Sequence, residues 1–336
     1  MDVQTIVIVT IVVALIFDVI NGFHDAANSI ATVVSTRVLS PKAAVLWAAT
    51  FNFVALFIFH EGVANTISKT IEIQQGDPAF VWVVICGLIG AILWNLLTWW
   101  LGLPASSSHA LIGGLSGAGI AYGGLDVLKW AMLKPTLIFI IVAPLIGLVL
   151  GGLLMFLVFW ALRRMRPRKV DGTFRVGQLI SAAAYSIGHG GNDAQKTMGV
   201  IWAVMIAGGM LSKDATSIPN WVVIASYSAM AFGTAIGGWR IVKTMGMGLT
   251  HLKPVGGFCA EVAGAVTLFM ATRLHVPVST THTITGAIIG VGSVTKAKGI
   301  RWALATRIVW AWIFTIPAAG IVGAVLVLLA QALHAW

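Results

Sequence analysis

Two polar motifs, each occurring twice and in the same order, constrain the fold of this chain more than any other feature. The first is Gly22-Phe23-His24-Asp25-Ala26-Ala27-Asn28-Ser29, with a degenerate copy, Gly190-Gly191-Asn192-Asp193-Ala194-Gln195-Lys196-Thr197, in the second half. The second is Pro104-Ala105-Ser106-Ser107-Ser108-His109, repeated as Pro277-Val278-Ser279-Thr280-Thr281-His282. An ordered duplication of two motifs is hard to explain by packing and indicates two structural repeats that share one polar site.

Long apolar runs surround these motifs and place the chain in a membrane. Of the 336 residues, 58% are hydrophobic and only 10% are charged, and the mean hydropathy is +0.94. A soluble domain has about 25% charged residues. The runs have the length of helices and lack the alternation of barrel strands, so we predict an all-α integral membrane protein.

The order of the apolar runs predicts about 10–12 membrane segments, including broken or re-entrant helices. Glycine before each motif Asp lets the backbone leave the helix, so Val3–Ile20 and Ile30–Val38 are expected to form a helix broken at Gly22. The same argument predicts a break at Gly190. The other apolar runs, in chain order, are Ala43–Phe59, Ala79–Leu103, Ala110–Tyr122, Thr136–Leu162, Val176–Ile187, Met198–Gly208, Trp221–Gly238, Pro254–Thr272, Thr283–Val294 and Ala303–Leu333.

The most basic stretch of the chain, Arg163-Arg164-Met165-Arg166-Pro167-Arg168-Lys169, separates the two halves. We therefore predict a first repeat over residues 1–162, a cytoplasmic linker over 163–173 and a second repeat over 174–336, because cytoplasmic loops are rich in Lys and Arg. Five crossings in each half would invert the halves and put both termini and the acidic loop Glu61–Asp77 outside. The net charge of +10 then serves orientation and anionic lipid, and no nucleic-acid partner is expected.

The motifs predict a path for an anion together with a cation. An ionisable residue such as Asp25 or Asp193 at membrane depth marks a substrate or ion path. Proline starts a helix well, and the unpaired N–H groups of a first turn suit an oxyanion. Serine and threonine there are ordinary N-caps when they occur once, but two copies favour an anion cradle of hydroxyl groups, from Ser106, Ser107, Ser108, Ser279, Thr280 and Thr281.

Two carboxylates beside an anion repel it unless a cation or a proton neutralises them. The residues therefore predict cation-coupled anion transport. We expect the histidines that border the motifs to be hydrogen-bonded neighbours, and no metal-ligand spacing is present. Cys86 and Cys259 lie in apolar runs and are expected to be small core residues. Neither a metal nor a cofactor is expected, apart from a co-transported proton or sodium ion.

The four motifs resemble the duplicated signatures of the inorganic phosphate transporter (PiT) family, in the right order over essentially the whole chain. The resemblance implies two inverted repeats, phosphate uptake by sodium or proton symport, homodimers, and a place in the cytoplasmic membrane of a bacterium. By motif matching it assigns the substrate to Asp25, Asn28, Asn192, Asp193 and the six hydroxyl residues. Glu261, in Gly257-Phe258-Cys259-Ala260-Glu261, matches a glutamate linked to transport.

Two departures from the family pattern bear on the coupled ion. Lys196 stands where the family has Asn, and Asn52 is taken as the first-half counterpart of Glu261. We hypothesise that the Lys196 ammonium pairs with a nearby Asp in place of one sodium ion, so that coupling is to protons. The bacterial low-affinity branch that this variant resembles carries phosphate partly as a neutral metal complex. Asp18, two turns before Asp25, either relays protons or faces a polar neighbour.

Three other functions are weighed against phosphate symport. A sulfate permease of the same fold would use the same anion cradle. A passive channel is a second possibility, but charged residues around broken helices are more typical of a transporter with alternating access. An intramembrane Ser–His–Asp hydrolase needs one asymmetric nucleophile and base, whereas every motif here is duplicated, so no enzyme activity is expected.

Overall fold

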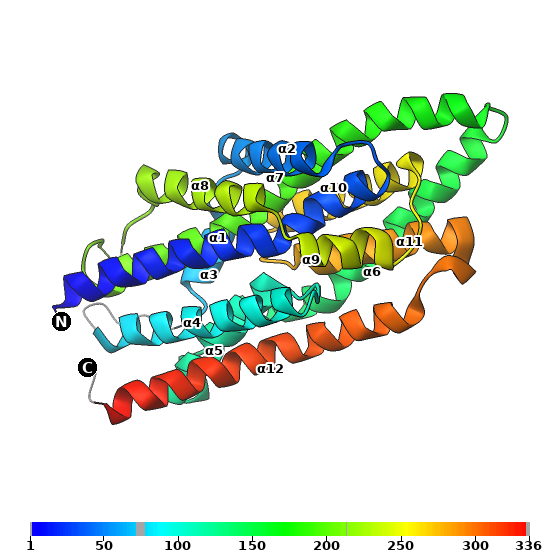
Figure 1. Cartoon of the computed structure of the whole chain (residues 1–336). Coiled ribbons are helices and arrows are strands. Elements are labelled where there is room, and N and C mark those ends of the chain that lie inside the picture. Colours follow the sequence, from blue (N-terminus) through cyan, green and yellow to red (C-terminus); the bar gives the residue numbers. More distant parts are fainter. Residues whose placement is uncertain (1, 72–77, 213, 334–336) are drawn as a thin grey trace.

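The computed structural model describes residues 2–71, 78–212 and 214–333, and α-helices account for most of them (Figure 1). The helices of the first half are α1 (Val3–Ser35), α2 (Pro41–Val54), α3 (Gly62–Ser68), α4 (Pro78–Trp100), α5 (Ser107–Gly123) and α6 (Trp130–Leu162). Those of the second half are α7 (Pro167–Ala207), α8 (Asn220–Ile236), α9 (Trp239–Val242), α10 (Pro254–Arg273), α11 (Thr280–Lys296) and α12 (Trp302–Ala332). The predicted all-α class is confirmed.

The two halves run in opposite directions. Helix α1 starts at the end of the molecule that holds both termini, whereas α7 starts at the far end, after the α6–α7 connection, and runs back (Figure 1). Each half then repeats the same order of elements, with a long first helix, a bent pair, a hairpin and a long last helix. The predicted inverted repeats are therefore confirmed.

Five helices are long and apolar enough to cross a membrane, and two bent pairs raise the number of spans to seven among the described residues. The bends are 86° between the α2 segment and α3, and 61° between α8 and the α9 segment. The described residues thus give five to seven candidate spans, fewer than the predicted 10–12 segments, and α5, α7 and α11 are further helices outside that number. The chain is thus a multi-pass membrane protein with broken helices.

The positions predicted for two of the breaks are wrong. Helix α1 continues through Gly22, and α7 continues through Gly190 without interruption. Both glycines instead let a neighbouring backbone approach. A Cβ at Gly22 would lie 2.3 Å from the carbonyl oxygen of Met230, and one at Gly190 would lie 2.4 Å from that of Asn52. Glycine inside a helix costs roughly 1 kcal/mol, and the close packing of α1 against α8 and of α7 against α2 offsets that cost.

The halves interlock through their last helices. Helix α6 packs along α11 of the second half, and α12 packs along α5 of the first. Both contacts depend on glycine at equivalent positions, because a Cβ at Gly113 would lie 2.5 Å from the Ile316 carbonyl oxygen and one at Gly286 would lie 2.2 Å from that of Pro144. Neither half could therefore bury these faces alone, since each packing unit takes helices from both.

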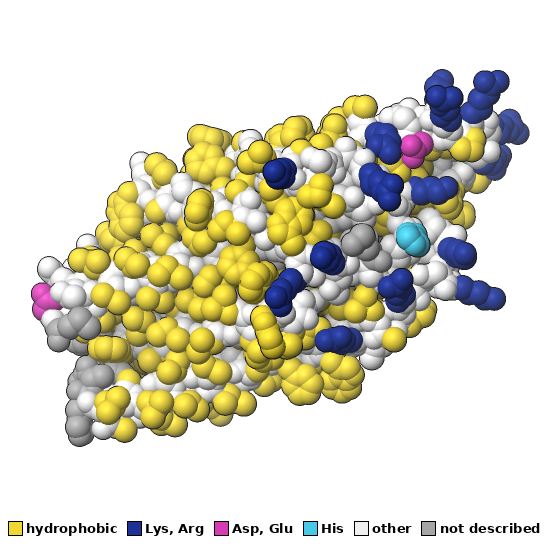
Figure 2. All heavy atoms as spheres, viewed as in Figure 1, with side chains coloured by type: hydrophobic (Ala, Val, Ile, Leu, Met, Phe, Trp, Pro, Cys, Tyr) yellow, Lys and Arg dark blue, Asp and Glu magenta, His cyan; other side chains and the backbone are white. Residues whose placement is uncertain are grey.

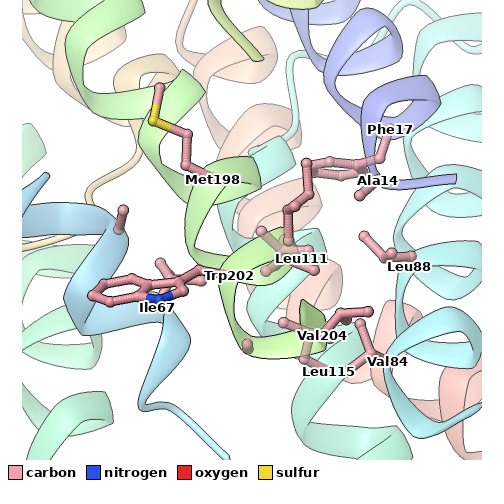
Figure 3. Packing of buried hydrophobic residues seen from close by; sticks show 14 of the residues in the cluster. Ala14, Phe17, Ile67, Val84, Leu88, Leu111, Leu115, Met198, Trp202 and Val204 are labelled. Carbon is pink, nitrogen blue, oxygen red and sulfur yellow. The ribbon is translucent and has the colours of Figure 1, made fainter. Parts of the chain in front are cut away.

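Two apolar cores lie at opposite ends of α1 and leave its middle polar. One packs the first part of α1 against α4, α5 and the second part of α7, and includes Phe17, Leu88 and Leu111 (Figure 3). The other packs the last part of α1 against α10, α11 and the first part of α7. The buried polar residues of α1 and α7 are thereby held between two rigid apolar layers.

On the face shown in Figure 2, most Lys and Arg side chains lie toward one end of the molecule. Apolar side chains cover most of the visible face, and Lys and Arg gather at the end of the α6–α7 connection (Figure 2). The basic stretch itself forms the turn after α6 and the first turn of α7, which begins at Pro167. In the acidic loop predicted on the opposite side, Glu72 and Asp77 lie outside the described residues.

Candidate functional site

Asp25 and Asp193 meet in the middle of the molecule. The hydroxyl oxygen of Thr280, in the first turn of α11, lies 3.5 Å from a carboxylate oxygen of Asp25 and 3.3 Å from one of Asp193. The two aspartates are 2% and 0% exposed. The duplicated motifs therefore place one carboxylate from each half at a single buried point, as the sequence predicts.

Asp25 is held by groups from the first half. Its Oδ1 lies 2.7 Å from Nδ1 of His24 and accepts a hydrogen bond of 3.2 Å from the hydroxyl of Ser107. The other ring nitrogen of His24 lies 3.1 Å from the hydroxyl of Thr98 on α4. His24 is thus a hydrogen-bonded neighbour, as predicted, and it fixes the orientation of the Asp25 carboxylate.

The hydroxyl motifs divide into caps and first-turn groups. Ser106 and Ser279 are the N-cap residues of α5 and α11, and each accepts a 3.2 Å hydrogen bond from the backbone N–H of the histidine three positions later. The capping role therefore holds for these two residues. The four hydroxyls that follow, from Ser107, Ser108, Thr280 and Thr281, stand in the first turns beside the aspartates.

Asn28 joins the first repeat to the second motif of the other half. Its amide nitrogen donates hydrogen bonds of 3.1 Å and 2.9 Å to the hydroxyls of Thr280 and Thr281. Asn28 is 1% exposed, and it lies on α1 one turn beyond Asp25. The predicted face formed by an Asp and the polar residue three positions later is therefore present, and it points at the start of α11.

Lys196 takes the equivalent position on α7, and its ammonium is fully bonded. It donates to Oδ1 of Asp193, to the hydroxyl of Ser108 and, at 2.8 Å, to the carbonyl oxygen of Val278. These bonds use all three N–H groups of the ammonium. Lys196 is 1% exposed, so a snorkelling surface lysine is excluded, and the predicted pairing with a nearby Asp is confirmed.

Asn192 positions the loop before α11. Its side-chain nitrogen donates to the hydroxyl of Thr272 and the carbonyl oxygen of Val276, at 3.1 Å and 3.2 Å, and its oxygen accepts from the N–H of Val278 at 3.1 Å. Both amide hydrogens are therefore used inside the protein. The structure places Asn192 beside the site as a support of the loop that carries Thr280.

Glu261 lies in a separate buried cluster toward the basic end. Its carboxylate accepts hydrogen bonds from the hydroxyls of Thr32 and Ser181 and from the amide of Gln178, at 2.6 Å for Thr32 and 3.0 Å for Gln178. Helices α1, α7 and α10 supply these groups. A buried carboxylate with three donors is well satisfied, so this cluster also ties the three helices together.

The pairing of Asn52 with Glu261 is wrong. Glu261 lies on α10, directly before the hydroxyl motif of α11, and the helix in that place in the first half is α4. Leu88 stands 18 residues before Ser106, as Glu261 stands 18 residues before Ser279. Asn52 lies instead on α2. Its amide nitrogen donates a hydrogen bond of 2.8 Å to the hydroxyl of Thr234, and its Oδ1 lies 3.2 Å from Nδ1 of His189.

His189 lies in the site itself, beside the carboxylate of Asp193. Its Nε2 lies 3.2 Å from Oδ2 of Asp193, and its Nδ1 lies 3.2 Å from the hydroxyl of Ser29. Ligand atoms of Asp25, His189 and Asp193 all lie within 4.8 Å of one another, a spacing that could hold a cation. The signal was available, because His189 precedes Asp193 by four residues and so shares its helix face.

The assembled site combines groups for an anion with groups for a cation. Hydroxyls at two helix N-termini and the Lys196 ammonium suit an oxyanion. Two carboxylates and an imidazole suit a positive charge. Every one of these side chains is buried, with at most 3% exposed. The site is thus closed to solvent and is made from both halves, which is the arrangement expected at the repeat interface of a transporter.

Comparisons with known proteins agree with this geometry. The Phosphate transporter family matches the chain twice, over residues 21–171 and 162–323, which is one match for each repeat. A protein of Rhizobium meliloti named "Probable low-affinity inorganic phosphate transporter" is 54% identical over 94% of this chain and 93% of its own length. A Bacillus subtilis protein of the same name is 42% identical over 97% of both chains.

A solved structure has the same fold. The protein titled "The sodium-dependent phosphate transporter" superposes with a TM-score of 0.86 over 98% of this chain and 99% of that chain, at 23% identity. At this identity the likeness concerns the fold, whereas the two family matches and the relatives above concern descent. On that evidence the chain belongs to the phosphate transporter family.

Proposed function

We propose that this protein imports inorganic phosphate by symport with protons. The observation that carries the proposal is the meeting of Asp25 and Asp193 at the hydroxyl of Thr280. This point is buried, receives groups from both inverted halves and lies at the start of α11. A secondary transporter binds its substrate at such a place and exposes it to each side in turn.

The phosphate would be bound by first-turn groups. Ser107 and Ser108 on α5, with Thr280 and Thr281 on α11, offer hydroxyls beside the positive ends of two helices. Asn28 adds amide donors, and its present partners are two of those hydroxyls. Tetrahedral phosphate has several acceptor oxygens, so donors arriving from two opposed helices can surround it.

Lys196 supports protons as the coupling ion. Its ammonium already balances Asp193, at the position where an exchangeable cation would otherwise sit. Asp25 has no such fixed partner among the described residues, because its closest groups are a histidine and two hydroxyls. The entry of an anion therefore requires a further positive charge at Asp25, and a proton supplies it without a coordination shell.

Sodium is the competing ion, and two observations favour it. The spacing of Asp25, His189 and Asp193 could hold a cation, and the protein with the same fold is named as sodium-dependent. The same three residues could take the metal of a neutral metal–phosphate complex. A sulfate permease would need the same hydroxyls, so competition of labelled phosphate uptake by sulfate separates the two substrates.

We further propose that the protein lies in the bacterial cytoplasmic membrane with its basic end inside and both termini outside. The support is the concentration of Lys and Arg at the α6–α7 end (Figure 2), which follows the positive-inside rule. Homodimer formation is proposed from the family resemblance, and cross-linking in native membranes tests it.

Purified protein in lipid vesicles tests the coupling ion. Uptake of labelled phosphate is measured with a pH gradient in sodium-free buffer and with a sodium gradient at equal pH. We expect the pH gradient alone to drive accumulation, and Lys196→Asn to add a sodium requirement, because it frees the carboxylate of Asp193. Lys42→Asn, a change at an exposed lysine, is the control. Strict sodium dependence of the unchanged protein at constant pH would contradict proton coupling.

A further inference from the structure

Asp18 is a buried carboxylate that the phosphate site does not use. It lies on α1 and is 0% exposed. Neither of its carboxyl oxygens has a hydrogen-bond partner among the described residues. Asp25 and Asp193, by contrast, are bonded on both oxygens or ion-paired. A charged carboxylate at this depth is costly without a compensating charge, so Asp18 either holds a proton or pairs with another positive ion.

The groups around Asp18 offer further free oxygens. Thr197 on α7 and Asn21 on α1 approach its carboxyl without making a well-formed hydrogen bond to it. The hydroxyl of Thr197 and Oδ1 of Asn21 are also buried without a hydrogen-bond partner among the described residues. The nitrogen of Asn21 is occupied by the sulfur of Met230, at 3.6 Å. Carboxylate, carbonyl and hydroxyl oxygens together make a ligand set for a hard cation.

The charged and titratable groups facing Asp18 do not neutralise it. From α7 these are Asp193 and Lys196, and from α8 the phenol of Tyr227. The three N–H groups of Lys196 are directed to Asp193, Ser108 and Val278. The Asp193 carboxylate adds negative charge. The charges of Asp193 and Lys196 therefore act on Asp18 in opposite directions, and the charge of Asp18 itself is left for an incoming positive charge to neutralise.

The second repeat has no such group. The residue seven positions before Asp193 is Ser186, as Asp18 is seven before Asp25, and its hydroxyl donates to the carbonyl oxygen of Ala182 at 2.8 Å. That position is closed by a local helix bond. Among the described residues, the unpartnered carboxylate therefore has no counterpart at the equivalent position of the second half.

We propose that Asp18, Asn21 and Thr197 form a second cation site, which takes a hard monovalent cation, H⁺ or Na⁺, during the phosphate cycle. A single carboxylate suits a monovalent ion better than a divalent one, which takes more oxygen ligands. Asp18 precedes Asp25 by about 10 Å along α1, so a cation bound here lies on the N-terminal side of the phosphate site. The transport role rests on the proposed phosphate symport, whereas the binding role does not.

Two measurements on the full-length protein test the site. In lipid vesicles, exchange of labelled for unlabelled phosphate is compared with net accumulation under a tenfold cation gradient. We expect Asp18→Asn to keep exchange within about twofold and to lower accumulation on the order of tenfold, because one coupled cation in a tenfold gradient contributes that factor. Thr197→Val should weaken the cation dependence in the same direction. Asp126→Asn, the same change at an exposed residue, should alter neither.

Arms with sodium at constant pH, and with a pH gradient in choline, identify the ion. Cation binding is measured separately, from the unfolding temperature of solubilised protein in sodium, choline and buffers of different pH. A shift in the unchanged protein that Asp18→Asn abolishes supports the site even if no phosphate is transported, in which case only the proposed function fails. Full accumulation by Asp18→Asn, a proportional loss of exchange and accumulation, or an unaltered temperature shift would overturn the proposal.

Discussion

The ion pair between Lys196 and Asp193 should be one of the most strongly coupled pairs in the protein. Its ammonium makes three hydrogen bonds, and both side chains are at most 1% exposed. Lys196→Met leaves the Asp193 carboxylate buried, with His189 and Thr280 as its contacting side chains among the described residues. Removing one partner of a buried pair costs about 3–5 kcal/mol. Asp193→Asn, which strands the ammonium instead, should have a similar cost.

The double variant Asp193→Asn/Lys196→Met removes both charges and should be more stable than the sum of the single effects allows, by about 2 kcal/mol or more. Unfolding is followed with a thiol-reactive dye in a denaturing detergent, because Cys86 and Cys259 are both buried in the folded protein. Lys42→Met, at an exposed lysine, should leave the transition unchanged. Single effects that add within about 0.5 kcal/mol would refute the pairing as the reason for the buried lysine.

Three further results are expected from the same assays. Gly22→Ala should destabilise the fold by about 1–3 kcal/mol, since its methyl group meets the α8 backbone. The control Gly172→Ala, whose methyl group would meet no atom within 4 Å, should not destabilise the fold. Equal stabilities of the two variants would contradict the packing argument. Ser106→Ala should cost about 0.5–2 kcal/mol of stability through the lost cap, while Ser107→Ala should raise the phosphate KM; the reverse pattern would exchange their roles. Glu261→Gln should slow net uptake more than it changes the phosphate KM, and a change in KM alone would place Glu261 among the substrate ligands.

The residue pattern alone predicts the all-α fold class, the inversion of the two halves and the convergence of the two motif pairs. Apolar runs and charge distribution fix the first two, since a chain with five segments in each half must reverse its second half. The convergence of Asp25 and Asp193 at Thr280 follows because repeats related by symmetry bring equivalent positions to one centre. None of these inferences depends on the detailed backbone path.

Glycine shows where the pattern was insufficient. A glycine inside a membrane helix is equally consistent with a break and with a close helix contact. At Gly22 and Gly190 only the neighbouring backbones of Met230 and Asn52 decide the matter, and these lie far away in the sequence. The breaks occur elsewhere, between α2 and α3 and between α8 and α9.

The sequence pattern also does not predict which role each side chain of a motif takes. Ser106 and Ser107 are adjacent and chemically identical, yet one caps α5 and the other bonds Asp25. Helix starts are defined to a single residue only by backbone angles. The amide of Asn192 is chemically suited to bind a substrate, but both of its N–H groups donate to Thr272 and Val276 before α11. Sequence spacing identifies which residues can reach the site and leaves their partners open.

The central claim is that both halves bind one phosphate ion between the starts of α5 and α11. An experimental structure of the protein with phosphate, in lipid and without sodium, tests it most directly. We predict phosphate within hydrogen-bonding distance of the Ser107 and Thr280 hydroxyls, with Lys196 still paired to Asp193. Phosphate bound at any other place, with the space between these hydroxyls unoccupied, would contradict the account.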